Sequence, residues 1–325
     1  MFERLKRYRH VAAAAPLMLA LIATASAQAP YPSRNITLVL PFAAGSGTDT
    51  TTRLIGKELG VGLGVSMVIE NKAGANGSIA ASYVARSAPD GYTLFVTTNT
   101  SHSANPYLLK NMTYDPIKDF TPIARTGDLP FMLVIHPDVP ANSVAELIAL
   151  AKKEPGKYSY ASGSSSAIVS GATFARLAGI DLLHVPYKSS PPALTDVIAG
   201  RVSMMFIDVP TGLPHVNGKA LKALAVTTKK PSALLPNLPT MDNTVKGFDI
   251  TSWQGYLGPA NMPKDIVVKL NAEIRKIIER PDIKNQLAER GMEAFSGTPE
   301  EFDAFLKEQL VLWEKLIADA GIEKQ

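Results

Sequence analysis

From Ile36 onward the sequence alternates short apolar runs with longer amphipathic segments. Short apolar runs bounded by turn-forming residues are typical of β-strands, and longer amphipathic segments are typical of helices. The alternation predicts an α/β protein. The expected strands are 36–40, 67–70, 92–97, 131–136, 158–161, 182–186, 202–207, 221–227 and 250–257. The expected helices are 50–59, 76–88, 143–153, 168–178, 192–199, 265–279, 281–290 and a last one that opens at Thr298 and runs to about Ala320.

The amino-terminal residues have the pattern of a secretory signal peptide. Basic residues at positions 4, 6, 7 and 9 precede an apolar segment, Val11–Ile22, and Ala25-Ser26-Ala27 forms a small-residue cleavage site. The apolar segment is shorter than the roughly 18–20 residues that a membrane-spanning helix needs. We therefore expect residues 1–27 to be a signal peptide, cleaved after Ala27, and the mature protein to be periplasmic.

Charge and cysteine content narrow the partners that the mature chain can have. The full sequence has 33 Lys and Arg against 29 Asp and Glu, a net charge of +4. Four of the basic residues and one acidic residue lie in the predicted signal peptide, so the mature chain carries only +1. A nearly neutral chain gives no reason to expect a nucleic-acid partner. The chain has no cysteine, which excludes disulfides, thiol catalysis and a lipid anchor on cysteine.

Two irregular stretches divide the expected elements into three parts. Residues 113–122 are rich in loop-forming residues, and residues 229–248 contain three prolines. The simplest arrangement joins the first and last parts into one lobe, 28–126 plus 249–325, and makes 127–248 the other lobe. Two doubly wound α/β lobes joined by two crossovers then hold a ligand cleft between them, at the carboxyl ends of their strands.

The expected strand 36–40 is followed by a turn of small residues and then by a helix, which is a favourable place for an anion. Glycines at positions 45 and 47 permit positive φ and let a ligand approach the backbone closely. Free N–H groups and the partial positive charge at a helix start suit a carboxylate. An ordinary strand-to-helix turn has the same pattern, so both interpretations stay open. The candidate ligand-binding residues are Phe42, Ala43, Ala44, Gly45, Ser46, Gly47, Thr48 and Asp49.

A second candidate is the serine tract between the expected strand 158–161 and the expected helix 168–178. Its hydroxyl and N–H groups suit a second polar group, although a flexible polar loop explains the tract equally well. No G-x-S-x-G motif is present, because the tract lacks the second glycine. The candidates are Ser162, Gly163, Ser164, Ser165 and Ser166. Asn99, Tyr187 and Asp208, at or near the ends of other strands, complete the set, with a cap or turn role as the alternative for Asp208.

The sequence lacks the motifs of common catalytic and cofactor sites. Its histidines are scattered without metal-ligand spacing, and no H-E-x-x-H motif occurs. The glycines at 60, 62 and 64 follow a helix and precede a strand, which is the wrong order for a dinucleotide site, and no G-x-x-x-x-G-K-[ST] loop occurs. We therefore expect no metal, no cofactor and no enzymatic activity.

A series of short motifs runs through the expected mature chain in a fixed order. They are Tyr31-Pro32-Ser33, Pro41-Phe42-Ala43-Ala44-Gly45, Glu70-Asn71-Lys72-Ala73-Gly74-Ala75-Asn76-Gly77, Ala88-Pro89-Asp90-Gly91-Tyr92-Thr93-Leu94, Tyr114-Asp115-Pro116, His184-Val185-Pro186-Tyr187-Lys188, Leu224-Ala225-Val226-Thr227 and Gly297-Thr298-Pro299-Glu300-Glu301-Phe302. Together they resemble the periplasmic solute receptors of tripartite tricarboxylate transporters, the Bug-type family. The resemblance implies a type II periplasmic binding-protein fold that closes on its ligand. It also implies that the turn at 42–49 and the serine loop at 162–166 lie on either side of a carboxylate.

The resemblance further implies a monomeric receptor that captures a di- or tricarboxylate, an acidic amino acid or an aromatic acid. Such a receptor delivers its ligand to a separate membrane permease. The chain departs from the family pattern at Ser46 and at Ser189-Ser190, where glycine is common, so the ligands of the family cannot be carried over individually. Two other functions stay open: a secreted hydrolase of esters or amides, and a ligand sensor that docks to a signalling partner.

Overall fold

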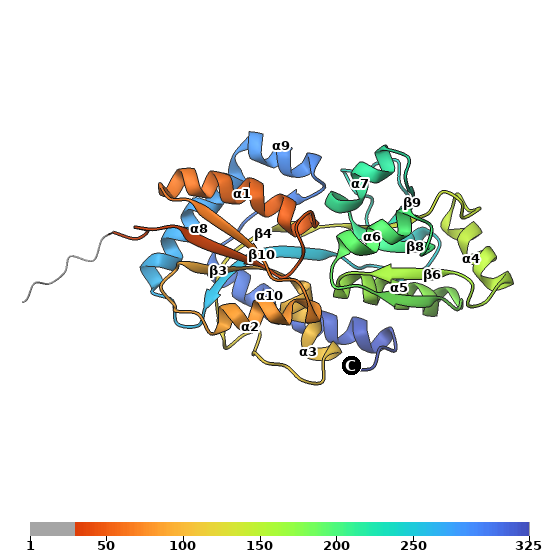
Figure 1. The fold of residues 1–325 in the computed structure, drawn as a ribbon, viewed down its shortest axis with the longest axis horizontal. Coiled ribbons are helices and arrows are strands. Elements are labelled where there is room, and N and C mark those ends of the chain that lie inside the picture. Colours follow the sequence, from red (N-terminus) through yellow and green to blue (C-terminus); the bar gives the residue numbers. More distant parts are fainter. Residues whose placement is uncertain (1–29, 325) are drawn as a thin grey trace, which may run out of the picture.

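Two β-sheets, each covered by helices on both faces, organise residues 30–324, which are the residues that the computed structural model describes (Figure 1). The predicted signal peptide and its cleavage site lie outside the described residues. The six-stranded sheet forms a first lobe and the five-stranded sheet a second lobe, drawn on the left and right of Figure 1. This arrangement confirms the predicted α/β fold of two lobes joined by two crossovers.

The sheet of the first lobe consists of β1 (Ile36–Leu40), β2 (Met67–Asn71), β3 (Thr93–Thr98), β4 (Phe120–Leu129), β10 (Ser252–Pro259) and β11 (Glu293–Ala294). The strand order is β11-β4-β10-β3-β1-β2. β1 pairs in parallel with β2 and β3, whereas β10 is antiparallel to β3 and β4. Leu38, at the centre of β1, lies opposite both Ile69 and Leu94. The carboxyl ends of β1 and β3 therefore meet at one edge of the sheet.

Helices cover both faces of this sheet. They are α1 (Gly47–Leu63), the 3-10 turn η1 (Ala75–Gly77), α2 (Ser78–Ala85), the π-helical turn η2 (Thr100–Ala104), α3 (Asn105–Leu108), α8 (Lys264–Glu279), α9 (Pro281–Glu289) and α10 (Pro299–Asp319). Apolar residues of α1, α8 and α9 pack on one face, and those of α2 and α10 on the other. In α8, Val267, Leu270 and Ile274 recur at helical spacing and are buried, as an amphipathic helix requires.

The sheet of the second lobe consists of β5 (Phe131–Ile135), β6 (Ser159–Ser162), β7 (Leu183–Pro186), β8 (Met204–Asp208) and β9 (Lys222–Val226), in the order β7-β6-β8-β5-β9. Its helices are α4 (Val144–Lys153), α5 (Ser165–Ala178), α6 (Ser190–Ile198), α7 (Val209–Asn217) and the 3-10 turn η3 (Met241–Asn243). β6, β7 and β8 run parallel to one another, and β5 is antiparallel to β8 and β9. Leu133 and Met132 of β5 belong to the cores on opposite faces, so this strand is buried on both sides.

The two crossovers run side by side between the lobes. One passes from β4 through Pro130 to β5, and the other returns from β9 to β10. β4 pairs with β10 in the first lobe, and β5 pairs with β9 in the second. The hydroxyl of Thr227 donates a hydrogen bond of 2.6 Å to the carbonyl oxygen of Ile250, within the second crossover.

The first crossover differs from the sequence prediction. Residues 113–122 were expected to be irregular, but β4 begins at Phe120 and continues to Leu129, past the predicted lobe boundary at residue 126. Pro122 fits into this strand because β11 pairs only with Gly127 and Asp128, so that β4 has a single neighbour, β10, at position 122. The lobe boundaries themselves stay a prediction.

Three helices also differ from the prediction. No helix was expected at 209–217, where α7 lies, because Pro210 and Pro214 interrupt the apolar pattern. Pro210 occupies the first turn, where no intrahelical N–H bond is lost, and the packing of α7 against the core of the second lobe compensates for Pro214. Helices α1 and α5 each begin three residues earlier than expected, because Ser46 and Ser164 cap them.

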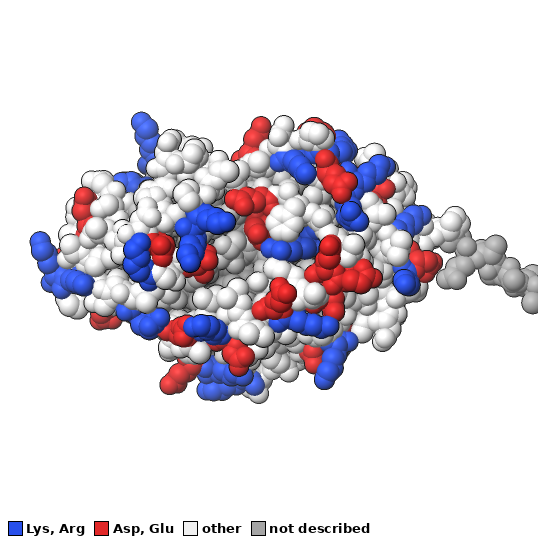
Figure 2. All heavy atoms as spheres, turned by 180° about the vertical axis from the view of Figure 1, so that it is seen from behind, with Lys and Arg blue, Asp and Glu red and all other residues white. Residues whose placement is uncertain are grey.

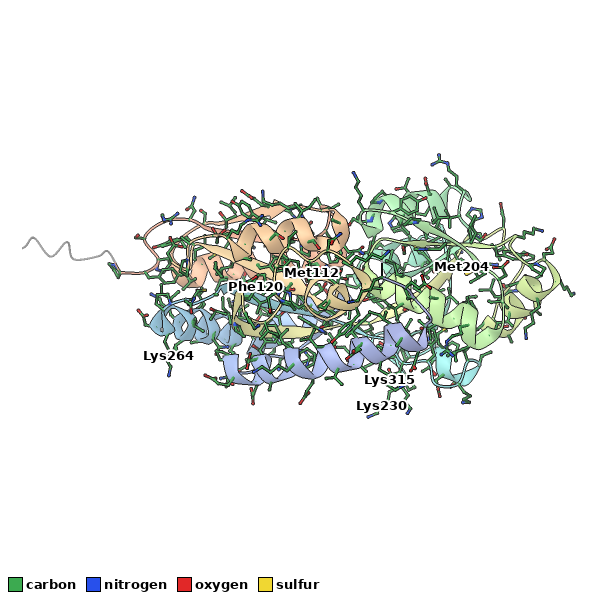
Figure 3. The ribbon with its side chains drawn as sticks, turned by 90° about the horizontal axis from the view of Figure 1, so that it is seen from below. Met112, Phe120, Met204, Lys230, Lys264 and Lys315 are labelled. Carbon is green, nitrogen blue, oxygen red and sulfur yellow. The ribbon has the colours of Figure 1, made fainter. Side chains whose placement is uncertain are left out.

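Helix α10 connects the two lobes, as Figure 3 shows from below, where it runs from the first lobe to Lys315 beneath the second. Phe302 and Leu306, in its first half, pack in the core of the first lobe. Trp313 and Ile317, in its second half, pack in the core of the second lobe. The helix opens with a capping box in which Thr298 and Glu301 exchange hydrogen bonds, as the sequence predicts for this start.

On the face shown in Figure 2, charges of both signs are interspersed and form no continuous patch of one sign. This agrees with the near-neutral mature chain and gives no support to a nucleic-acid surface. Among the helices of residues 30–324, none combines the length and the apolar composition of a membrane span.

Candidate ligand-binding cleft

A small cavity lies between the two lobes, at the carboxyl ends of their strands. Its volume of about 20 Å³ is enough for roughly one water molecule. The first lobe, the crossovers and the second lobe all contribute to it. The lining residues are Phe42, Ser46, Gly47, Thr48, Thr98, Thr100, Leu129, Phe131, Ser164, Ser190, Asp208 and Ser252.

The amino-terminal ends of four helices converge on this cavity. The cap or first residues of α1, α5, α6 and α7 all line it. Each helix start carries a partial positive charge from its aligned peptide dipoles. Neither Lys nor Arg is among the lining residues of the described chain, so these helix ends and the hydroxyl groups are the available partners for an anion.

The first two residues of α1 have backbone donors that find no partner among the described residues. Ser46 caps the helix by accepting a hydrogen bond of 3.3 Å from the N–H of Asp49. Gly45 has a φ of +81°, which favours glycine at this position. Within residues 30–324, the N–H groups of Gly47 and Thr48 donate to no protein acceptor, and both residues line the cavity. They are the donors that an anion in the cleft would reach.

Asp49 faces away from the cavity and holds the turn in place. Its carboxylate accepts hydrogen bonds from the N–H of Gly45 at 3.0 Å, from Arg53 at 2.9 and 3.0 Å and from Asn71 at 3.0 Å. Burial alone would raise the pKa of Asp49, but the hydrogen bonds from Arg53, Gly45 and Asn71 outweigh it and hold that pKa below its ordinary value. The geometry gives Asp49 a structural role in the turn and no contact with the cavity.

The residues of the serine tract have different roles and contact different partners. Ser164 caps α5 and lines the cavity. The N–H of Ser165 donates to the hydroxyl of Thr100 in the first lobe, at 3.3 Å. The hydroxyl of Ser162 lies 2.6 Å from Nε2 of His184, inside the second lobe. A Cβ atom at Gly163 would come within 2.2 Å of the backbone of Ser189, so glycine is needed for β6 and α6 to approach.

Further hydrogen bonds join the lobes around the cavity. The N–H of Ala43 donates to the hydroxyl of Ser189 at 3.1 Å. The amide nitrogen of Asn99, a fully buried residue, donates to the hydroxyl of Ser166 at 3.0 Å. Oδ1 of Asn99 also accepts from the hydroxyl of Ser252, the first residue of β10. Asn99 and Ser166 therefore stabilise the contact between the lobes, and neither lines the cavity.

Asp208 enters the cavity from the second lobe and meets the start of α1. Its Oδ1 accepts hydrogen bonds from the N–H and the hydroxyl of Thr211, at 3.0 and 2.5 Å, which caps α7. A Cβ atom placed on Gly47 would lie 2.1 Å from this oxygen. Burial raises the pKa of Asp208, and the hydrogen bonds from Thr211 oppose this rise without cancelling it.

Tyr187 takes no part in the cavity. Its hydroxyl donates a hydrogen bond of 2.6 Å to Asp196 of α6. Burial and this hydrogen bond raise the pKa of Tyr187 to about 12. The residue fixes the loop between β7 and α6.

The structure thus brings six of the predicted site residues together in the cavity: Phe42, Ser46, Gly47, Thr48, Ser164 and Asp208. Ten others do not line it: Ala43, Ala44, Gly45, Asp49, Asn99, Ser162, Gly163, Ser165, Ser166 and Tyr187. The candidate residues taken from the sequence do not include Thr98, Thr100, Leu129, Phe131, Ser190 and Ser252, which also line the cavity. Thr98 and Thr100 lie at the end of an expected strand, which is a usable signal, whereas Leu129, Phe131 and Ser252 are strand ends next to the crossovers, with no local motif.

The sequence matches the model of a known protein family. Residues 51–322 match the model of the "Tripartite tricarboxylate transporter family receptor", TctC. The chain belongs to this family. Protein BugT of Bordetella pertussis (strain Tohama I) is 30% identical over 293 residues, which cover 89% of this chain and 90% of BugT. The Bug-type resemblance of the sequence is therefore confirmed.

Solved structures of the same kind share the fold of this receptor. Rpa4515 of R. palustris, described with adipate, superposes with a TM-score of 0.89 at 34% identity, and the match covers 91% of this chain and 100% of that one. MatC (Rpa3494) of Rhodopseudomonas palustris, described with bound malate, superposes with a TM-score of 0.82 at 30% identity, and the match covers 88% of this chain and 100% of that one.

These relationships decide between the classes of function that the sequence left open. The family consists of solute-binding receptors of transporters, so the chain is a binding protein and not an enzyme. The alternative of a secreted hydrolase is wrong. The serine tract is explained instead by helix capping and by contacts between the lobes. Within residues 30–324, no group of His, Asp or Glu side chains is arranged to hold a metal ion.

Proposed function

We propose that this receptor captures a small organic carboxylate in the cleft between its lobes. One observation carries the proposal: within residues 30–324 the N–H groups of Gly47 and Thr48 donate to no protein acceptor, and both residues line the cavity. A carboxylate placed there accepts two backbone hydrogen bonds and benefits from the dipole of α1. The hydroxyls of Ser164 and Ser190, on the opposite lobe, are suited to hold the other end of the ligand.

The binding mechanism that we propose is a shift toward the closed form. Residues 28–126 with 249–325, and residues 127–248, move as two bodies about the paired crossovers. In the closed form, Ser189 meets Ala43 and Asn99 meets Ser166 across the cleft. A ligand that contacts both lobes favours this form over the open one by its differential affinity. Of the predicted residues that do not line the cavity, Ala43, Asn99, Ser165 and Ser166 then act by closing it, and Gly45 and Asp49 act by shaping the turn.

We further propose that the mature receptor begins at Gln28, after cleavage behind Ala27, and works in the periplasm as a monomer. Membership of the transporter receptor family supports delivery of the ligand to membrane permease subunits. Pull-down of the closed receptor with the permease subunits tests this step. Capture of a signalling protein in place of the permease would favour the sensor alternative.

A thermal-shift screen of mono-, di- and tricarboxylates on the purified mature protein tests the ligand class. A ligand at about 100 times its dissociation constant adds roughly 2.7 kcal/mol to the free energy of unfolding. We expect at least one acid to raise the melting temperature of the wild type. No response to a broad panel of acids would contradict the proposal. Binding by the wild type that persists in Gly45→Val, where any side chain is strained at φ +81°, would show that the site lies elsewhere.

A further inference from the structure

Asp208 is an unusual residue to find in a cleft that we propose for anions. Among the described residues that line the cavity, it is the single charged one, and its side chain is more than nine-tenths buried. A carboxylate in such a place costs free energy unless a hydrogen-bond donor or a cation satisfies it. The residue therefore requires an explanation beyond the capping of α7.

The two oxygens of this carboxylate differ in their surroundings. Both hydrogen bonds from Thr211 go to Oδ1. Within residues 30–324, Oδ2 accepts no side-chain or backbone hydrogen bond from another residue. A helix cap needs only the first of these oxygens. The second is available to a group in the cavity.

The position of Asp208 fixes which part of a ligand it would meet. Its Oδ1 lies against Gly47, where a Cβ atom would be 2.1 Å away, and Gly47 carries one of the two free N–H groups. A ligand carboxylate held by Gly47 and Thr48 is therefore an immediate neighbour of the carboxylate of Asp208. Two adjacent carboxylates repel each other unless a proton or a cationic group lies between them.

We propose that the ligand of this receptor carries a hydrogen-bond donor, a hydroxyl or an ammonium group, on the carbon next to the carboxylate that Gly47 and Thr48 bind, and that Asp208 accepts from this donor. This inference rests on the proposed function. A donor atom on that carbon is two bonds from the carboxylate carbon, which matches the contact between Asp208 and Gly47. Asp208 is then a residue that determines specificity, because it disfavours acids without the donor.

Matched sets of acids that differ at one substituent test the proposal. They are propionate, lactate and alanine; succinate, malate and aspartate; and glutarate, 2-hydroxyglutarate and glutamate. Isothermal titration of the wild type at about pH 7.5, where carboxyl groups are ionised, gives the affinity ratio within each set. We expect the 2-hydroxy or the 2-amino acid of the best set to bind about tenfold or more tightly than the unsubstituted acid. The better of the two identifies the donor.

The variant Asp208→Asn is the decisive comparison, because asparagine keeps a capping oxygen for α7 but loses the charge. We expect it to fold, as its melting curve will show, and to bind the substituted and unsubstituted acids of a set within about threefold of each other. Ser143→Ala, which removes the cap of α4 far from the cavity, should leave the wild-type ratio unchanged. An unsubstituted acid that binds the wild type as tightly as its 2-substituted relatives, or a ratio that Asp208→Asn does not alter, would overturn the inference.

The failure of this inference can be told apart from the failure of the proposed function. If no acid of any set binds, the proposed function itself fails. A different result is that unsubstituted acids bind, and that their affinity for the wild type rises as the pH falls while their affinity for Asp208→Asn does not. In that case Asp208 acts as a protonated donor to the ligand. That result would overturn the requirement for a donor on the ligand and leave the carboxylate receptor in place.

Discussion

The hydroxyl of Ser189 accepts a hydrogen bond of 3.1 Å from the N–H of Ala43, across the cleft between the two lobes. Ser189 precedes α6 but does not cap that helix with its side chain. Its hydroxyl therefore contributes to the contact between lobes and hardly to the stability of either lobe. A substitution of Ser189 should therefore affect closure of the lobes without destabilising either lobe.

We expect Ser189→Ala to weaken binding of the tightest acid by about two- to tenfold, because a net hydrogen bond of the closed form is worth about 0.5–1.5 kcal/mol. Isothermal titration measures the affinity, and small-angle X-ray scattering measures the shift toward open molecules. The melting temperature of the free protein should change little. Equal affinities of Ser189→Ala and wild type would show that the Ala43–Ser189 contact is not needed for closure.

We expect Gly47→Ala to abolish ligand binding while the protein stays folded. The added methyl group would lie 2.1 Å from Oδ1 of Asp208 and 3.2 Å from Pro210, so the lobes cannot close as they do here. Gly218→Ala is the matched control, since its methyl group meets no atom closer than 3.2 Å and lies at the far end of α7. Titration and melting curves of both variants check the prediction, which undiminished binding by Gly47→Ala would contradict.

We expect Asp49→Asn to lower the free energy of unfolding by about 1.5–3 kcal/mol at neutral pH, because a buried, charged acceptor of several hydrogen bonds is lost. The pKa of Asp49 is lowered in the folded state, so its contribution is complete above the unfolded-state pKa of about 3.9 and is lost as the pH falls through the folded-state pKa. The difference in free energy of unfolding between wild type and Asp49→Asn should therefore become smaller in acid. Urea unfolding at neutral pH and below about pH 3 measures it.

A control for Asp49 is Asp303→Asn, which removes an exposed ion pair with Lys307 and should change stability by less than about 1 kcal/mol. A difference between Asp49→Asn and wild type that stays constant down to acid pH would contradict the role assigned to the ionised carboxylate.

We expect His102 to make the protein less stable in mild acid. This residue is fully buried beside the rings of Phe95 and Phe120, and burial lowers its pKa to about 3. The unfolded chain binds a proton below its ordinary pKa of about 6.5 and the folded chain does not, so stability falls by up to about 1.4 kcal/mol per pH unit below that value. Urea unfolding between about pH 4 and pH 7 measures the slope.

Replacement of the imidazole should remove this part of the slope. We expect the free energy of unfolding of His102→Phe to depend on pH less steeply than that of the wild type. The difference in slope should correspond to one proton. Phe120→Leu, which disturbs the same cluster without removing a titrating group, should lower stability by a similar amount at every pH. Parallel slopes for His102→Phe and wild type would show that the imidazole does not titrate on unfolding.

The local parts of the site were predictable from the sequence. The run from Leu38 to Asp49 contains a buried strand, flexible glycines and a capping serine within a few residues, and each of these acts over one turn of chain. The structure forms this unit as a strand, a turn and α1. Both ends of the helix were misplaced: the sequence predicts 50–59, whereas α1 begins at Gly47, behind the capping Ser46, and continues to Leu63.

The parts that depend on distant contacts were not predictable in this way. α7 contains Pro214, and only its packing against the core of the second lobe explains why it is helical there. β4 contains Pro122, which is tolerated because β11 is too short to reach it. Ser252 and Phe131 enter the cavity because the crossovers pass beside it, and no pattern of neighbouring residues encodes that course.

Helix α10 has its first half embedded in the core of one lobe and its second half in the core of the other. Its 21 residues make a rod of roughly 30 Å that cannot shorten or stretch. When the two lobes move apart, either Trp313 must leave its packing in the second lobe, or one lobe must rotate relative to the other about α10. The length of α10 therefore limits how far the two lobes can separate, and with it the size of the largest ligand that can enter between them.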